Sequence, residues 1–223
     1  MPKKAGMEAW KKQRRKEHMA KIIHRYYLFC EGEQTEPLYF EGFRRLIEEN
    51  PVYHEMVQIH IEPCGAETMR VISMAEEYVR NNEISKGQIW CIYDKDSFPP
   101  ERFNGVAERA ASLNKENPDL QYRVAWSNEC IEFWFILHFA NYTANNHRSE
   151  YIKFLSSKFK ELGLGDYKKN RKDIFEILRK YGREDLAIRF AKRIIEENAD
   201  KTPTDIAPGT TVYELVEEFE KYI

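Results

Sequence analysis

The fold is decided by the stretch Ile89-Trp90-Cys91-Ile92-Tyr93-Asp94-Lys95-Asp96-Ser97. Its apolar run, bounded by Gly87 and by Pro99-Pro100, predicts a buried strand. Side chains two residues apart on a strand point to the same side, so Asp94 and Asp96 are expected to project together from its end. Two carboxylates that close repel each other unless a cation lies between them, and oxygen ligands suit Mg²⁺ or Mn²⁺. The alternative is an Asp-rich turn whose side chains hydrogen-bond to the backbone.

A second acidic turn follows an earlier strand. Residues 26–30 are apolar and aromatic and predict a buried strand, which Glu31 and Gly32 follow directly. Glycine permits a tight turn at this point, and Thr35 or Glu36 can begin a helix. That helix is expected because the next apolar residues have helical spacing: Leu38, Phe40, Phe43, Leu46 and Ile47.

Strands alternate with helices through the first 126 residues. The further elements are strands at 56–61 and 120–126 and helices at 67–79 and 101–114. This alternation predicts an α/β fold with a parallel sheet covered by helices on both faces. Binding sites in such sheets lie beyond the carboxyl ends of the strands, where Glu31 and the pair Asp94 and Asp96 all fall.

The segment after the fourth strand predicts a buried helix over 130–139, because it is apolar almost all round. Glu132 falls in its first turn. Burial of a lone carboxylate is unfavourable, so Glu132 requires a partner, a cation, or the amides of the helix N-terminus. His138 on the same helix is interpreted as a core histidine.

No strand is predicted beyond residue 141. Helices are expected at 148–163, 171–181, 184–198 and 210–222, and the basic run 168–172 connects two of them. This run can bind a phosphate backbone or form a solvated turn. The chain is therefore divided into a basic N-terminal segment (1–25), an α/β domain (26–140) and a helical C-terminal region packed on it (141–223).

Composition narrows the class of protein. The 223 residues are 42% hydrophobic and carry a net charge of −2, which supports a folded core and excludes a uniformly basic nucleic-acid binder. No apolar run is long enough for a membrane helix, and the polar N-terminus does not resemble a signal peptide. The four widely spaced cysteines are expected to be core thiols of a cytoplasmic protein.

Four motifs together resemble the RloB-like family. They are 30–40 (CEGEQTEPLYF), 94–96 (DKD), 125–139 (AWSNECIEFWFILHF) and 210–216 (TTVYELV), so the resemblance runs from about residue 26 to the C-terminus. Glu129 stands where that motif has proline after the Ser-Asn pair, which adds a charge near the predicted site.

The family is similar to toprim proteins, which include topoisomerase and primase domains and defence nucleases. The resemblance implies that Glu31 is the toprim glutamate, a metal ligand or general base, and that Asp94 and Asp96 bind Mg²⁺ or Mn²⁺. It implies a role in phage defence beside an ATPase partner. Glu132 joins these three as a candidate catalytic residue, and the candidate substrate contacts are Glu33, Lys95, Ser127, Lys168, Lys169 and Arg171.

The leading prediction is therefore metal-dependent cleavage of phosphodiester bonds in DNA or RNA. An aspartyl-phosphate phosphatase also uses Asp-x-Asp after a strand. In that class the motif usually opens the domain, whereas here it follows the third predicted strand, which argues against a phosphatase. A non-catalytic subunit that binds metal and nucleic acid for an ATPase partner is the alternative from a different class. The apolar stripe of the last helix is explained equally well by self-association and by packing in the core, so both interpretations stay open.

Overall fold

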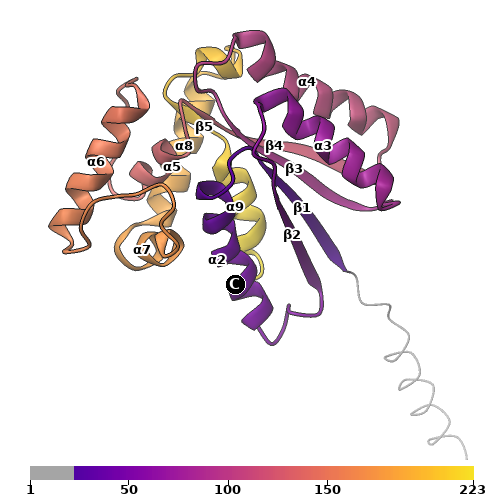
Figure 1. Cartoon of the computed structure of the whole chain (residues 1–223), viewed down its shortest axis with the longest axis horizontal. Coiled ribbons are helices and arrows are strands. Elements are labelled where there is room, and N and C mark those ends of the chain that lie inside the picture. Colours follow the sequence, from indigo (N-terminus) through magenta and orange to yellow (C-terminus); the bar gives the residue numbers. More distant parts are fainter. Residues whose placement is uncertain (1–22) are drawn as a thin grey trace, which may run out of the picture.

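The computed structural model describes residues 23–223, which form a single five-stranded sheet with helices on both faces (Figure 1). The strand order is β2-β1-β3-β4-β5. The strands are β1 (His24–Cys30), β2 (Val57–Pro63), β3 (Gly87–Asp94), β4 (Leu120–Asn128) and β5 (Gly209–Thr210). The first four are parallel and β5 is antiparallel to β4, so the predicted α/β architecture and its toprim-like parallel sheet are confirmed.

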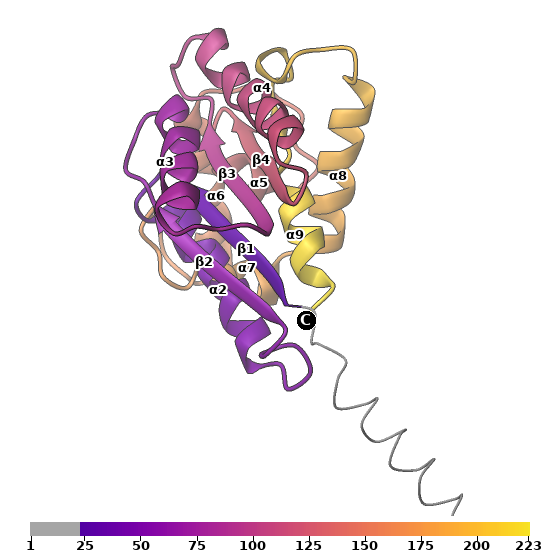
Figure 2. The ribbon, with the colours of Figure 1, turned by 90° about the vertical axis from the view of Figure 1, so that its right-hand side faces the viewer.

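Eight helices accompany the sheet in the described part of the chain. They are α2 (Thr35–Glu49), α3 (Thr68–Asn81), α4 (Pro100–Glu116), α5 (Glu132–Leu137), α6 (Arg148–Glu161), α7 (Ile174–Tyr181), α8 (Glu184–Glu197) and α9 (Val212–Glu220). The chain leaves β1 toward β2 and then returns past β1 to β3. Right-handed crossovers in opposite directions place α2 on one face and α3 and α4 on the other, and α9 shares the face of α2 (Figures 1 and 2).

The side chains of β1 show why both faces are covered. Tyr26 packs on Phe219 of α9 with ring centroids 5.2 Å apart, whereas Phe29 packs on Tyr78 of α3 at 5.5 Å. Successive residues point to opposite faces, so a strand buried on both sides must be apolar throughout. The continuous apolar run 89–93 of β3 is fully buried for the same reason.

The C-terminal part differs from the sequence prediction in one respect. A strand was not expected after residue 141, but β5 pairs with the end of β4 at Ser127 and Asn128. Two residues are too short to show a strand periodicity, so the sequence carries no signal for it. The helix expected over 210–222 accordingly begins later, at Val212.

One hydrophobic core runs through both the α/β part and the helical part. Phe135 of α5 and Phe175 of α7 both pack against Tyr39 of α2, with ring centroids 5.3 and 5.9 Å away. Through Phe175, the helical region packs against α2. The basic segment 1–25 lies outside the described residues, except for its last three.

Cysteine placement agrees with the prediction of core thiols. All four are free, with Cys30, Cys91 and Cys130 buried and Cys64 half-buried. Among residues 23–223, no helix has the length and apolar character needed to cross a membrane.

The exposed edge of β4 is tied to α4 by one side chain. Asn114 Nδ2 donates to the Tyr122 carbonyl (2.8 Å), and the Tyr122 amide donates to Asn114 Oδ1 (2.6 Å). β5 does not reach this part of β4, so the asparagine replaces a neighbouring strand there.

We expect Asn114→Ala to lower the free energy of unfolding by about 1–3 kcal/mol, because two backbone groups of β4 lose their partner. Urea unfolding would measure the change. Asn145→Ala, at an exposed asparagine, is the matched control and should leave the midpoint unchanged. Equal midpoints for the two variants would contradict the role given to Asn114.

Candidate functional site

A cleft of about 610 Å³ lies at the carboxyl ends of the parallel strands. It is lined by residues 31–36, 65–67, Asp94, Asp96, Phe98, 131–132 and 169–170. These segments follow β1, β2 and β3 or begin α5, except for 169–170, which lie in the loop between α6 and α7. The strands β1 and β3 flank the point where the strand order reverses. Ligands of open α/β sheets bind at this switch point.

Glu31 is fixed at the centre of the cleft by two donors. Its Oε1 accepts from the hydroxyl of Thr68 (2.9 Å) and its Oε2 from the backbone amide of Asp94 (2.8 Å). Burial nevertheless raises the pKa of Glu31 to about 7, although both hydrogen bonds act in the opposite direction. The carboxyl of Glu31 therefore titrates near neutral pH.

Asp94 is the last residue of β3 and points toward the N-terminus of α5. Burial raises its pKa well above the usual range, and the charges of Glu36, Glu132 and Glu31 add to this shift. The amide of Ile131, just before α5, donates to Asp94 and favours its ionised form. Asp94 thus experiences the repulsion of three neighbouring carboxylates.

Glu36, in the first turn of α2, is a buried carboxylate with only 5% of its surface exposed. Burial raises its pKa, and the charge of Glu132 does so as well, while the amides of Glu36 and Gly32 stabilise its ionised form. A Cβ at Gly32 would lie 2.3 Å from Glu36 Oε2. Glycine is therefore required at residue 32 for the Glu36 side chain to fold back over the turn.

Glu132, the first residue of α5, is completely buried. Its Oε1 accepts from the hydroxyl of Tyr167 (3.0 Å), and the Lys169 ammonium lies 3.7 Å from the same oxygen. Its Oε2 is buried and accepts no hydrogen bond. A buried carboxylate oxygen with no donor is unfavourable unless a cation reaches it.

The donor chemistry of this cluster fits a hard divalent cation. Glu31, Glu36, Asp94 and Glu132 offer only oxygen atoms, which Mg²⁺ and Mn²⁺ prefer. As the side chains stand, however, no three His, Cys, Asp or Glu residues in the described part of the chain form a group that could hold a metal ion. Their carboxylates are turned toward hydroxyl, amide and cationic partners within the protein instead.

Asp96 lies in the cleft but outside the strand. β3 ends at Asp94, and Asp96 follows in a left-handed conformation (φ 43°), so the two-residue strand period does not extend to it. Its carboxylate forms an ion pair with Arg148 of α6. Both aspartates line the cleft, although Asp96 reaches it from a turn.

The predicted substrate contacts divide into two groups. Lys169 and the exposed Glu33 line the cleft. The others are engaged elsewhere or are exposed outside it: Lys95 Nζ donates to the Phe98 carbonyl (2.5 Å), Ser127 Oγ bonds to Thr210 Oγ1 (3.0 Å), Arg171 pairs with Asp173 (2.8 Å), and Lys168 is exposed.

Three site residues were not predicted from the sequence. Glu36 belongs to the quoted motif but was interpreted only as a helix start. Arg148 pairs with Asp96 across 52 positions and also lies 3.5 Å from Glu129 through Nε. Tyr167 donates to Glu132 across 35 positions. Contacts of such separation leave no local pattern.

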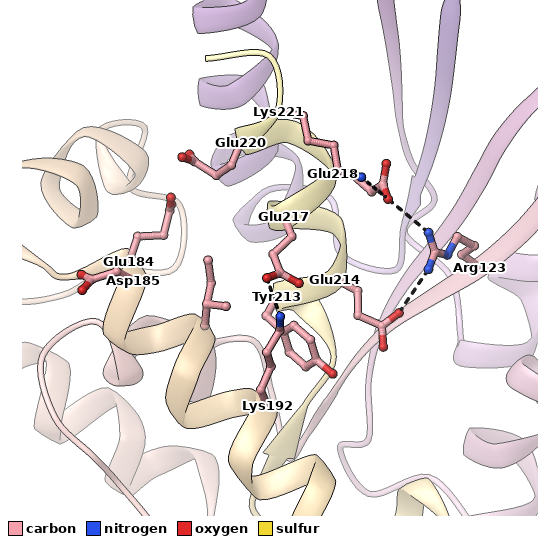
Figure 3. Close-up of a pocket in the computed structure, with 11 residues that line it drawn as sticks. Arg123, Glu184, Asp185, Lys192, Tyr213, Glu214, Glu217, Glu218, Glu220 and Lys221 are labelled. Carbon is pink, nitrogen blue, oxygen red and sulfur yellow. Dashed lines mark hydrogen bonds and ion pairs between the residues drawn. The ribbon is translucent and has the colours of Figure 1, made fainter.

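A wider groove of about 900 Å³ lies between α8 and α9, away from this cleft (Figure 3). Its two basic side chains at the centre are paired with acids: Lys192 pairs with Glu217 (2.6 Å), and Arg123 lies between Glu214 and Glu218 at 3.7 and 3.4 Å. Exposed ion pairs of this kind are ordinary surface features, so we place the functional site in the smaller cleft.

Fold and cleft together define an α/β protein with a carboxylate site at the switch point of its parallel sheet. The family model described as RloB-like protein matches residues 26–219, which is most of the chain. The protein therefore belongs to the RloB-like protein family. Comparisons with curated proteins and with solved structures give no match.

The raised pKa of Glu31 has a consequence for stability. Between the ordinary value of 4.5 and the folded value of about 7, the folded protein retains a proton that the unfolded chain has lost. The free energy of unfolding must therefore fall as the pH rises across this window. Asp94, whose pKa is raised as well, changes stability in the same direction.

We expect Glu31→Gln to reduce the loss of stability between pH 5 and pH 8 by about 1–2 kcal/mol, after allowance for solvent screening. Urea unfolding at several pH values would measure the slope. Glu108→Gln, an exposed residue of α4, should keep the wild-type slope. Parallel pH profiles for wild type and Glu31→Gln would show that Glu31 ionises normally.

Proposed function

We propose that this chain is a metal-dependent nuclease of toprim type that cleaves phosphodiester bonds in DNA or RNA. The observation that supports this proposal most strongly is the group of mutually repelling, largely buried carboxylates at the switch point, with Glu132 Oε2 left unpaired. Stability alone would not favour such a group, because each ionised member raises the free energy of its neighbours. Perturbed acids in a cleft are typical of functional sites.

Glu31, Asp94 and Asp96 are the proposed metal ligands, and Glu36 and Glu132 add further carboxylate oxygens on the wall of the cleft formed by the helix starts. A bound Mg²⁺ or Mn²⁺ supplies charge stabilisation at the phosphate and lowers the pKa of coordinated water. A carboxyl that titrates at about 7 can also accept a proton at neutral pH, so Glu31 is suited to act as general base.

The role and partner of the nuclease rest on the family resemblance. On that basis we propose that the protein acts in defence against phage in the cytoplasm and that an ATPase partner regulates it. The sequence gives no preference between DNA and RNA as substrate.

A non-catalytic subunit is the second candidate, and the charge of the cleft favours it. Seven of the lining residues are acidic and only Lys169 is basic: the acids are Glu31, Glu33, Glu36, Glu67, Asp94, Asp96 and Glu132. In this case the chain would bind the metal, and the ATPase partner would supply most contacts to the nucleic acid.

The test is cleavage of plasmid DNA and of total tRNA with Mg²⁺ or Mn²⁺. We expect wild-type protein to give metal-dependent products and Asp94→Ala to lower the rate at least about 100-fold, because a metal ligand is lost. Asp200→Ala, at an exposed residue, is the matched control and should retain full activity.

Metal-dependent cleavage by Asp94→Ala at the wild-type rate would contradict the role of Asp94 as a metal ligand. If the isolated wild type binds Mn²⁺ but gives no products, the second candidate is favoured. The assay is then repeated with the proposed ATPase partner added.

A further inference from the structure

Two cations from the helical region face the acids of the cleft. Arg148, the first residue of α6, pairs with Asp96 and lies 3.5 Å from Glu129 through its Nε. The Nζ of Lys169, in the loop between α6 and α7, lies 3.7 Å from Glu132 Oε1. Both contacts join the helical region to acids that lie in the cleft.

These two cations differ from the other basic residues near the cleft. Lys95 is bound to the Phe98 carbonyl, and Arg171 is held by Asp173 while it packs over the ring of Phe159. In contrast, Arg148 and Lys169 pair with acids that line the cleft, Asp96 and Glu132, and their side chains are 26% and 48% exposed. A ligand in solvent can therefore reach both without unfolding the loop.

Their backbones are held in place while their charged ends face the cleft. The carbonyl of Lys169 accepts from the Thr35 hydroxyl (2.8 Å) at the start of α2. Arg148 is anchored as the first residue of a helix. Long side chains on fixed backbones can move their charge by several ångströms through rotamer changes alone.

A polyanion that enters this cleft meets an excess of negative charge, which must be neutralised near the phosphates. Asp96 and Glu132, which hold the two cations, belong to the same carboxylate group that fits a divalent ion. A metal ion and a basic side chain that share one carboxylate repel each other, so a bound metal weakens the attraction between that carboxylate and the basic side chain.

We propose that Arg148 and Lys169 exchange partners: they neutralise Asp96 and Glu132 in the metal-free protein and bind the phosphodiester backbone when those carboxylates turn to a metal ion. The guanidinium of Arg148 suits bidentate phosphate binding, and Lys169 contributes a point charge. This inference rests on the proposed nuclease function and names the residues that position its substrate.

The inference requires opposite effects on two ligands, which a merely structural role would not produce. Arg148→Gln and Lys169→Gln remove the competing cation, so each should bind Mn²⁺ about 3–10-fold more tightly in calorimetry without nucleic acid. Each should bind a non-cleavable phosphorothioate oligonucleotide about 10-fold more weakly in the presence of Mn²⁺. The slope of log affinity against log salt should decrease by about 0.7–0.9 for each substitution.

The matched controls remove a lysine of α6 that does not line the cleft. Lys153 pairs with Glu150 and Lys160 with Asp166, and both are exposed. Lys153→Gln and Lys160→Gln should keep the wild-type affinity for Mn²⁺ and the wild-type oligonucleotide affinity. Urea midpoints verify that all four variants fold.

Three outcomes would overturn the inference. Weaker binding of both ligands by a folded Arg148→Gln or Lys169→Gln would assign a structural role to that residue. If the salt slope is unchanged in both variants while the wild type binds Mn²⁺ and cleaves normally, the exchange of partners is rejected. The proposed nuclease function is then still supported. A wild type that neither binds Mn²⁺ nor cleaves would reject the nuclease itself, and the exchange with it.

Discussion

The repulsion among largely buried carboxylates at one edge of the sheet is the constraint on which the site depends. Asp94 lies close enough to Glu31, Glu36 and Glu132 that their charges all raise its pKa. A fold with ordinary marginal stability tolerates such a group only if a large core offsets it. That core is adjacent: α2 and α5, which carry Glu36 and Glu132, pack through Tyr39 and Phe135, and Tyr39 also accepts from the indole of Trp134 (2.9 Å).

The sheet and the helical region contribute different parts of the site. Strand ends and helix starts fix the acids, because backbone amides and the Thr68 hydroxyl hold Glu31, Glu36 and Asp94 in place. The region beyond residue 141 supplies the positive charge and the Tyr167 hydroxyl that face these acids. The two parts share one hydrophobic core, which fixes the helical region relative to these acids.

The sheet was predictable from the sequence because buried parallel strands carry a distinct signal. The run 89–93 and the run 26–30 are apolar without interruption and end at acids, which located both the strands and the positions of Glu31 and Asp94. Helix periodicity located the covering layers to within a few residues. A two-residue strand such as β5 carries no such signal.

The site was only partly predictable. The strand β3 ends at Asp94, and Asp96 lies in the turn that follows it. Sequence alone does not locate the last residue of the strand. Glu36 was obscured because acids are common in the first turn of any helix. Arg148 and Tyr167 reach the cleft through tertiary contacts, so only their three-dimensional placement shows their connection to Asp96 and Glu132.

The pairing of β1 with α9 links the two ends of the described chain. The hydroxyls of Tyr26 and Tyr222 lie 3.0 Å apart, although 196 positions separate them in sequence. During synthesis on the ribosome, the ring of Tyr26 lacks its partner Phe219 until α9 emerges. Contacts of such long range delay folding. A partly made chain therefore lacks this part of the covering of the sheet that carries Glu31 and Asp94 until α9 has left the ribosome.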